Sequence, residues 1–125
     1  MEPSDLVLKW SKLLLLEKDE VEKEVDKFDN AELEGVYRIS RKQPDGKFYV
    51  VFVGSTTDLK KDLLKLIEEK SINFLKQGGE FSFRFSLVKG EEIRKAIEKQ
   101  MYKQYAPEYN SKEPNSSLDV KVNLN

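Results

Sequence analysis

The feature that most constrains this chain is a strong turn signal between two β-rich runs. Residues 36–39 alternate as a strand does, and residues 47–53 are β-branched or aromatic at almost every position. Between the two runs lies Gln43-Pro44-Asp45-Gly46, where proline presets φ and glycine accepts a positive φ. This order predicts a β-hairpin, and the continuous second run predicts a strand that is covered on both faces.

Helical and strand patterns follow the hairpin. Thr57 or Asp58 can cap a helix that extends to about Glu69, and a second short helix is predicted over 71–77. Phenylalanines alternate with polar residues over 81–86, which predicts a third strand with one aromatic face. An apolar stripe at helical spacing then predicts a helix that stops at Pro107. This stripe consists of Ile93, Ile97, Met101 and Tyr105.

The two ends of the chain differ from its middle. Over residues 1–34, apolar side chains recur at steps of three, four and seven and most of the other residues are charged, a pattern that predicts an acidic amphipathic helix. We expect this helix to pack on its own domain, with a partner helix as the alternative. Residues 111–125 form a polar tail whose last apolar residues alternate, so the tail is either an added edge strand or a disordered end.

These elements predict an α+β fold with a small three-stranded antiparallel sheet flanked by helices. The domain itself spans 35–110, and 1–34 form an N-terminal helical extension. Residues 1–34 carry eleven acidic and five basic side chains, whereas 35–110 carry fifteen basic and ten acidic ones. The net charge of −1 therefore hides an acidic front and a basic core.

Composition excludes several classes of chemistry. The chain has no Cys and no His, which excludes disulfide scaffolds, thiolate or imidazole metal sites, and histidine acid–base catalysis. Catalysis would need carboxylates, Lys, Arg, Tyr, Ser or Thr, with a divalent cation on oxygen ligands. No apolar run is long enough to span a bilayer and the N-terminus is acidic, so we expect a cytoplasmic protein without membrane contact.

A set of short motifs over 35–110 resembles the GIY-YIG endonuclease domain. The matching residues are Gly35-Val36-Tyr37, Phe52-Val53-Gly54-Ser55-Thr56, Asp58-Leu59-Lys60-Lys61, Arg94, Ile97-Glu98 and Tyr105-Ala106-Pro107-Glu108-Tyr109-Asn110. The resemblance implies a DNA phosphodiesterase fold. In that family a helical Glu holds a divalent metal, a Tyr helps to activate water, and an Arg faces the scissile phosphate.

The resemblance implies a partly dismantled site. Tyr37, Glu98 and Asn110 are retained, and Glu98 is the implied metal ligand, with Mg²⁺ or Mn²⁺ if the domain is active. Phe52 stands where the family has a second Tyr and lacks its hydroxyl. Asp62 stands where the family has its Arg, which reverses the charge that would face a phosphate. Because that Arg and one Tyr are missing, we favour an i, i+4 salt bridge between Glu98 and Arg94 over a metal.

Three hypotheses follow. The first is a degenerate nuclease-fold domain without nuclease activity that binds nucleic acid or a protein. Its candidate phosphate contacts are Arg38, Arg41, Lys42, Lys60, Lys61 and Lys65. The second is an active but divergent metal-dependent endonuclease, in which a lysine replaces the Arg. The third is an interaction protein that docks a protein partner through the N-terminal helix.

Overall fold

Strand β3 (Gly35–Lys42) runs through the middle of the sheet, between β4 (Phe48–Thr56) and β5 (Phe81–Leu87). All pairings are antiparallel, and a short strand β2 (Leu14–Leu15) completes a four-stranded sheet in the order β2-β5-β3-β4. The structure is a computed structural model that describes residues 4–29, 32–69, 79–108, 110, 116 and 120–123. The α+β class is therefore confirmed, with one strand more than the sequence predicted.

The predicted hairpin is the link between β3 and β4. The Gln43 N–H donates to the carbonyl of Lys47, and the Gly46 N–H donates to that of Gln43. Gly46 adopts a φ of +83°, which explains the glycine in the turn. A register shift between Ile39 and Ser40 places one extra residue in β4 at the middle of the ribbon.

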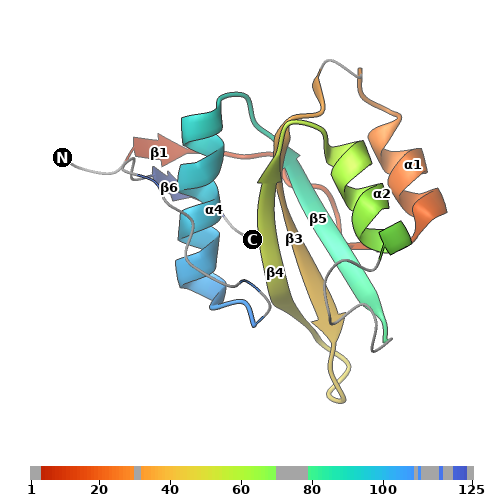
Figure 1. Ribbon diagram of the computed structural model, residues 1–125. Helices are drawn as coiled ribbons and strands as arrows, with labels where there is room; N and C mark the ends of the chain where they lie inside the picture. Colours follow the sequence, from red (N-terminus) through yellow and green to blue (C-terminus); the bar gives the residue numbers. More distant parts are fainter. Residues whose placement is uncertain are drawn as a thin grey trace.

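Three helices cover the two faces of the sheet within the described residues. Helix α4 (Glu91–Tyr105) packs on one face, and α1 (Lys18–Val25) and α2 (Leu59–Glu69) lie side by side on the other (Figure 1). The three phenylalanines of β5 belong to the core under α1 and α2, as their alternation predicts. The core under α4 contains Val36 and Val53 from the sheet and Ile97 and Met101 from the helix.

Helix boundaries follow the expected capping chemistry. The Asp58 side chain accepts a hydrogen bond of 3.1 Å from the Lys61 N–H, so Asp58 caps α2. Helix α4 ends at Tyr105, where Ala106 adopts the left-handed conformation with φ of 45° just before Pro107. The predicted short helix over 71–77 lies outside the described residues.

The predicted N-terminal helical extension is wrong. Helix α1 contains eight residues, and the residues before it form β1 (Ser4–Leu6) and β2. The leucine run explains the error, because its burial alternates with a period of two. Leu14 is 2% exposed, whereas Leu13 and Leu15 are 40% and 44% exposed. Leu14 pairs with Phe83, so the front supplies the fourth strand of the sheet.

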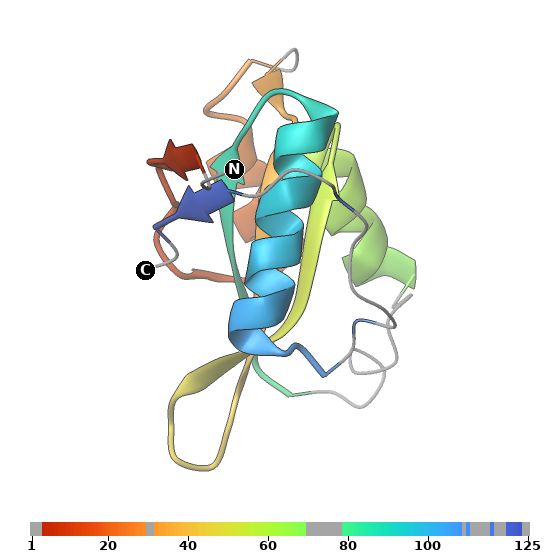
Figure 2. The ribbon, with the colours of Figure 1, turned by 90° about the vertical axis from the view of Figure 1, so that its left-hand side faces the viewer.

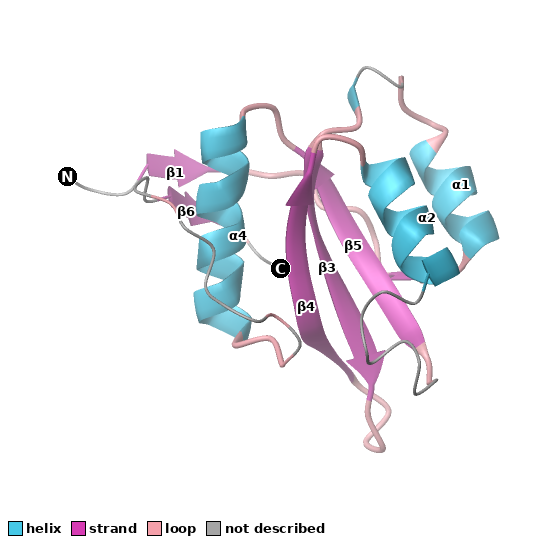
Figure 3. Cartoon of the chain, in the orientation of Figure 1, coloured by secondary structure: helices cyan, strands magenta, loops and turns pink. Residues whose placement is uncertain are grey.

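The N-terminal and C-terminal segments meet outside the main sheet. Strand β6 (Val120–Val122) pairs in parallel with β1, and Figure 3 shows this pair on the far side of α4 from the sheet. Figure 2 shows both strands beside α4 when that helix faces the viewer. The tail strand therefore does not extend the four-stranded sheet. Among the described residues, no helix is long and apolar enough to cross a membrane.

Candidate functional site

The phenol of Tyr37 lies across the edge strand β4. Tyr37 pairs with Gly54 in the β3–β4 register. A Cβ atom on Gly54 would lie 2.5 Å from Cζ and 2.6 Å from the hydroxyl oxygen of Tyr37, which is closer than any real contact. The glycine therefore leaves the space that the ring occupies. Tyr37 is 5% exposed, so its hydroxyl is fixed inside the fold.

Two carboxylates on different helices act electrostatically on this hydroxyl. Burial raises the pKa of Tyr37 well above its ordinary value, and the negative charges of Asp62 on α2 and Glu98 on α4 raise it further. The phenol, which is already protonated at neutral pH at its ordinary pKa, is therefore still harder to deprotonate here. In this state Tyr37 can donate a hydrogen bond, but it cannot act as a general base.

Glu98 is held by a serine that was not among the predicted site residues. The Ser55 hydroxyl donates to Oε1 of Glu98 at 2.7 Å, which links β4 to α4. Burial raises the pKa of Glu98, whereas the hydrogen bond from Ser55 and the charge of Lys95 act in the opposite direction. Ser55 follows Gly54 directly and lies two residues after Val53, so the two side chains share one face of the strand. This alternation is the sequence signal that could have identified Ser55.

The predicted salt bridge between Arg94 and Glu98 is wrong. Arg94 is 5% exposed and its guanidinium forms an ion pair with Glu34, just before β3. Arg94 and Glu98 are one turn apart on α4, but Arg94 pairs with Glu34 and Glu98 accepts a hydrogen bond from Ser55. Glu98 therefore faces β4, where Ser55 is its hydrogen-bond partner.

Phe52 and Asn110 support the same strand without contributing a reactive group. The rings of Phe52 and Tyr37 lie 6.2 Å apart between centroids, and Phe52 packs against the core under α2. The Asn110 side chain accepts from the Val53 N–H at 2.9 Å and donates to the Val53 carbonyl at 3.0 Å. Asn110 thus pairs with the edge strand as a neighbouring strand would, one residue before Gly54.

The six candidate phosphate contacts are in very different environments. Arg38 is 6% exposed, and its guanidinium lies over the rings of Trp10 and Tyr105. Three others contact the protein: Arg41 lies over Phe81, Lys42 pairs with Glu80 at 3.5 Å, and Lys60 pairs with Asp26 at 2.8 Å. In the described part of the chain, Lys61 and Lys65 on α2 are exposed and form no ion pair.

The residues present provide few ligands for a metal ion. Among the described residues, no group of three Asp or Glu side chains is arranged to hold one. Glu98 would be a single carboxylate ligand, and one of its oxygens already accepts from Ser55. A hydrated Mg²⁺ or Mn²⁺ can be held by one carboxylate when water and phosphate oxygens complete its coordination. The residues fit only that weak mode of binding.

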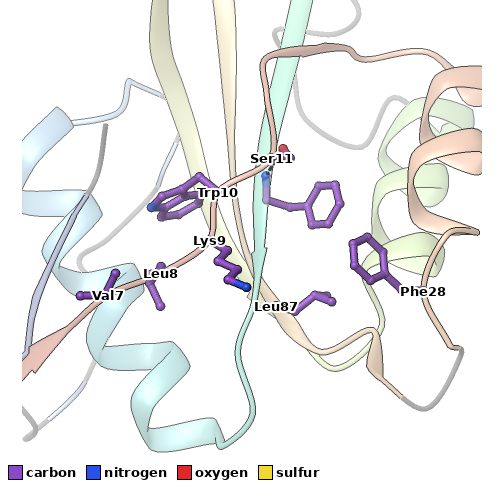
Figure 4. Close-up of a pocket in the computed structure, with 8 residues that line it drawn as sticks. Val7, Leu8, Lys9, Trp10, Ser11, Phe28 and Leu87 are labelled. Carbon is purple, nitrogen blue, oxygen red and sulfur yellow. Dashed lines mark hydrogen bonds between the residues drawn. The ribbon is translucent and has the colours of Figure 1, made fainter.

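A separate apolar pocket lies between the N-terminal segment and α1. Its volume is about 480 Å³, and Figure 4 shows residues 7–11 on one side with Phe28 and Leu87 on the other. The rings of Phe28 and Phe85 meet edge to face at 6.0 Å between centroids. Among the described residues that line this pocket, Lys9 alone has a titratable side chain. These residues therefore offer no acid–base pair.

Comparison with known proteins gives one structural likeness. No protein-family model and no curated protein matches the chain. The structure is similar to the crystal structure of the GIY-YIG N-terminal endonuclease domain of UvrC from Thermotoga maritima, a point mutant bound to its catalytic divalent cation. The two chains are 23% identical, with a TM-score of 0.49, over 75% of this chain and 99% of that one.

Proposed function

We propose that this chain is a nuclease-fold domain that cleaves phosphodiesters poorly or not at all, and that binds nucleic acid. The observation that carries the proposal is the charge around Tyr37. Asp62 and Glu98 both act on its hydroxyl, and Asp62 stands where the resemblance would place an arginine. A phosphodiester that approaches this hydroxyl would be repelled by both carboxylates while its own negative charge increases.

The chemistry of phosphodiester hydrolysis explains why this arrangement impairs cleavage. The reaction needs a proton acceptor for water and cations for the phosphate oxygens. Tyr37 keeps its proton at neutral pH, as an ordinary phenol does, and its raised pKa makes deprotonation harder still; Phe52 has no hydroxyl. One lost electrostatic donor costs about 3–4 kcal/mol of transition-state stabilisation, and replacing guanidinium by carboxylate adds repulsion to that loss.

The basic side of α2 supports a binding role. Lys61 and Lys65 are exposed and free of ion pairs within the described residues, so both are available to phosphates. The acidic front partly neutralises the same helix, because Asp26 at the end of α1 pairs with Lys60. This contact supports regulation of the basic surface by the front segment.

Docking of a protein through the N-terminal helix has less support. Val21 and Val25 of α1 are fully buried in the domain's own core, so the apolar face of that helix is already covered. The exposed face is mostly charged. We therefore retain nucleic acid as the proposed partner.

A plasmid-nicking assay with Mg²⁺ or Mn²⁺ tests the loss of catalysis. We expect no cleavage above background for the full chain, and no difference between it and Glu98→Gln. Metal-dependent nicking that Glu98→Gln abolishes would overturn this part of the proposal. The protein would then be an active, divergent endonuclease.

Fluorescence anisotropy with labelled DNA and RNA over a salt series tests binding. We expect Lys61→Gln with Lys65→Gln to reduce the slope of log K against log salt by about 2, close to one unit for each lost phosphate contact. Lys89→Gln, an exposed lysine in the loop before α4, is the matched control and should change the slope little. Absence of binding at low salt would refute nucleic acid as the partner.

A further inference from the structure

A strip of buried polar groups lies on the α4-facing side of β5. Ser82, Arg84 and Ser86 alternate with the three phenylalanines, so they share the opposite face of the strand. Ser82 Oγ, Arg84 Nε and Ser86 Oγ are buried, and none has a hydrogen-bond partner in the described structure. Buried polar atoms in folded proteins are nearly always paired, and of these three residues Arg84 lines a cavity, so its guanidinium has room for a hydrogen-bond partner there.

Two arginines lie directly opposite each other in this strip. Arg84 on β5 pairs in register with Arg38 on β3, so both side chains leave the same face of the sheet. Like charges at such a position repel, and the charge of Arg84 adds to burial in lowering the pKa of Arg38. Arg84 forms no hydrogen bond or ion pair with any described residue. An anion between the two guanidinium groups would relieve this repulsion.

A cavity gives both arginines a common opening. It measures about 640 Å³, a size typical of small-molecule sites, and both guanidinium side chains contribute to its lining. Ser40 and Tyr105 add hydroxyl groups, and Lys47 adds a third cation at the rim. The lining includes Tyr105, the last residue of α4, and Lys47 and Phe48 where β4 begins; Figure 1 shows the β3–β4 hairpin extending beyond that end of α4.

Arg38 is held in place before any ligand arrives. Its guanidinium lies 4.7 Å from the centroid of the Trp10 ring and 5.3 Å from that of Tyr105. Its Nη1 atom also donates to the Tyr105 hydroxyl at 2.7 Å, which fixes the direction of the guanidinium. A preorganised guanidinium loses little entropy when it binds an anion.

We propose that this cavity binds a phosphate monoester, with Arg84 and Arg38 as the two cationic contacts. Two guanidinium groups, a lysine and two hydroxyls match a doubly charged anion with several acceptor oxygens better than a single carboxylate. The phenyl ring of Phe48 and the ring of Tyr105 line the same cavity and can contact the organic part of the ligand. The cavity contains none of Tyr37, Asp62 or Glu98, so the proposal does not depend on the proposed function.

Isothermal titration calorimetry on the full chain tests this site, with inorganic phosphate and adenosine monophosphate as probes at fixed ionic strength. We expect both to bind, and Arg84→Gln to weaken each by about tenfold or more, because a charge-assisted hydrogen bond is lost. Lys18→Gln is the matched control, since Lys18 is exposed at the start of α1, on the other face of the sheet. This variant should bind both probes as the unmodified chain does.

Lys47→Gln provides a second variant, because Lys47 is exposed at the rim and its loss leaves the core intact. It should weaken phosphate by about threefold, as expected for an exposed charge. A 5′-phosphorylated oligonucleotide then separates the two sources of a phosphate monoester. If the oligonucleotide binds more tightly than adenosine monophosphate and Arg84→Gln weakens that binding, the ligand is a nucleic-acid end. If the oligonucleotide binds more weakly, the ligand is a free nucleotide. Binding that neither Arg84→Gln nor Lys47→Gln weakens, or no binding of either probe, overturns the proposal.

Discussion

Replacing Gly54 by alanine tests the close approach on which the site geometry depends. The new Cβ would lie 2.5 Å from Cζ, 2.6 Å from the hydroxyl oxygen and 2.9 Å from Cε1 of Tyr37. These atoms belong to a ring that is 5% exposed and packed against Phe52, so it has no free direction in which to move. The strand or the ring must therefore shift.

The magnitude follows from two opposing effects. Adding a methyl group to a packed core typically destabilises a protein by about 1–3 kcal/mol. Alanine also removes backbone freedom from the unfolded chain, which favours folding by roughly 0.5–1 kcal/mol relative to glycine. We expect a net loss of about 1–2 kcal/mol in the free energy of unfolding. With a urea m-value of about 2 kcal/mol/M, the midpoint should fall by about 0.5–1 M.

Urea denaturation in two backgrounds isolates the contact. In a Tyr37→Leu background the ring is absent, so Gly54→Ala should be neutral or stabilising, with a coupling energy of about 1 kcal/mol or more. Gly46→Ala is the matched control: Gly46 has a φ of +83°, and no other atom lies within 4 Å of the position that its Cβ would take, so its cost should be equal in both backgrounds. Equal costs of Gly54→Ala in the two backgrounds would refute the steric argument.

Three further predictions concern the side chains around this strand. The pKa of Glu98 is raised in the folded state, so ionisation of this carboxyl destabilises the fold as pH rises above the ordinary pKa near 4.5. Urea denaturation should therefore show that Glu98→Gln is more stable than the unmodified chain at neutral pH, and that this difference disappears near pH 4. Arg94→Met leaves Glu34 without its buried partner and should cost about 2–4 kcal/mol in the same assay. Asn110→Ala removes both bonds to Val53 and should accelerate hydrogen exchange of the Val53 amide, whereas amides in the centre of β3 should be unaffected.

Local signals predicted the hairpin, α2, α4 and the aromatic strand correctly. In each of these segments, the turn or capping residues agree with the hydrophobic period. Gly46 has the positive φ that its turn requires, and Asp58 caps α2 as its position suggests. Where local propensity and tertiary packing favour the same structure, a single sequence is sufficient to identify it.

The front segment is mispredicted because two periods coexist in it. Val21 and Val25 are one helical turn apart and are buried in α1, whereas Leu14 is buried as a strand residue. Trp10 lies over Arg38, a contact between distant parts of the chain that no local pattern encodes. A run of leucines fits either period, so long-range pairing with β5 decides between them.

The same dependence on long-range pairing applies to the partners of charged residues. Arg94 and Glu98 have the spacing of a helical salt bridge, but in the folded chain their side chains bond to Glu34 and Ser55. Both partners come from residues next to or within the sheet, and helix spacing alone contains no information about them. From the sequence, Arg84 is only a polar residue of an alternating strand, since its position opposite Arg38 depends on the register of β3 and β5.

The alternation of residues on β3 directs neighbouring side chains into different regions of the protein. On β3, Tyr37 contacts the core under α1 and α2, whereas Arg38 leaves the opposite face toward the end of α4. A substitution at one of these neighbouring positions therefore changes one region without repacking the other. On α2, Asp62 stands where the resemblance places an arginine. Arg38 on β3 and Arg84 on β5 are unaffected by that replacement. A domain with this sheet can therefore carry the wrong charge for phosphodiester cleavage beside Tyr37 and still retain a cationic cavity at the end of α4.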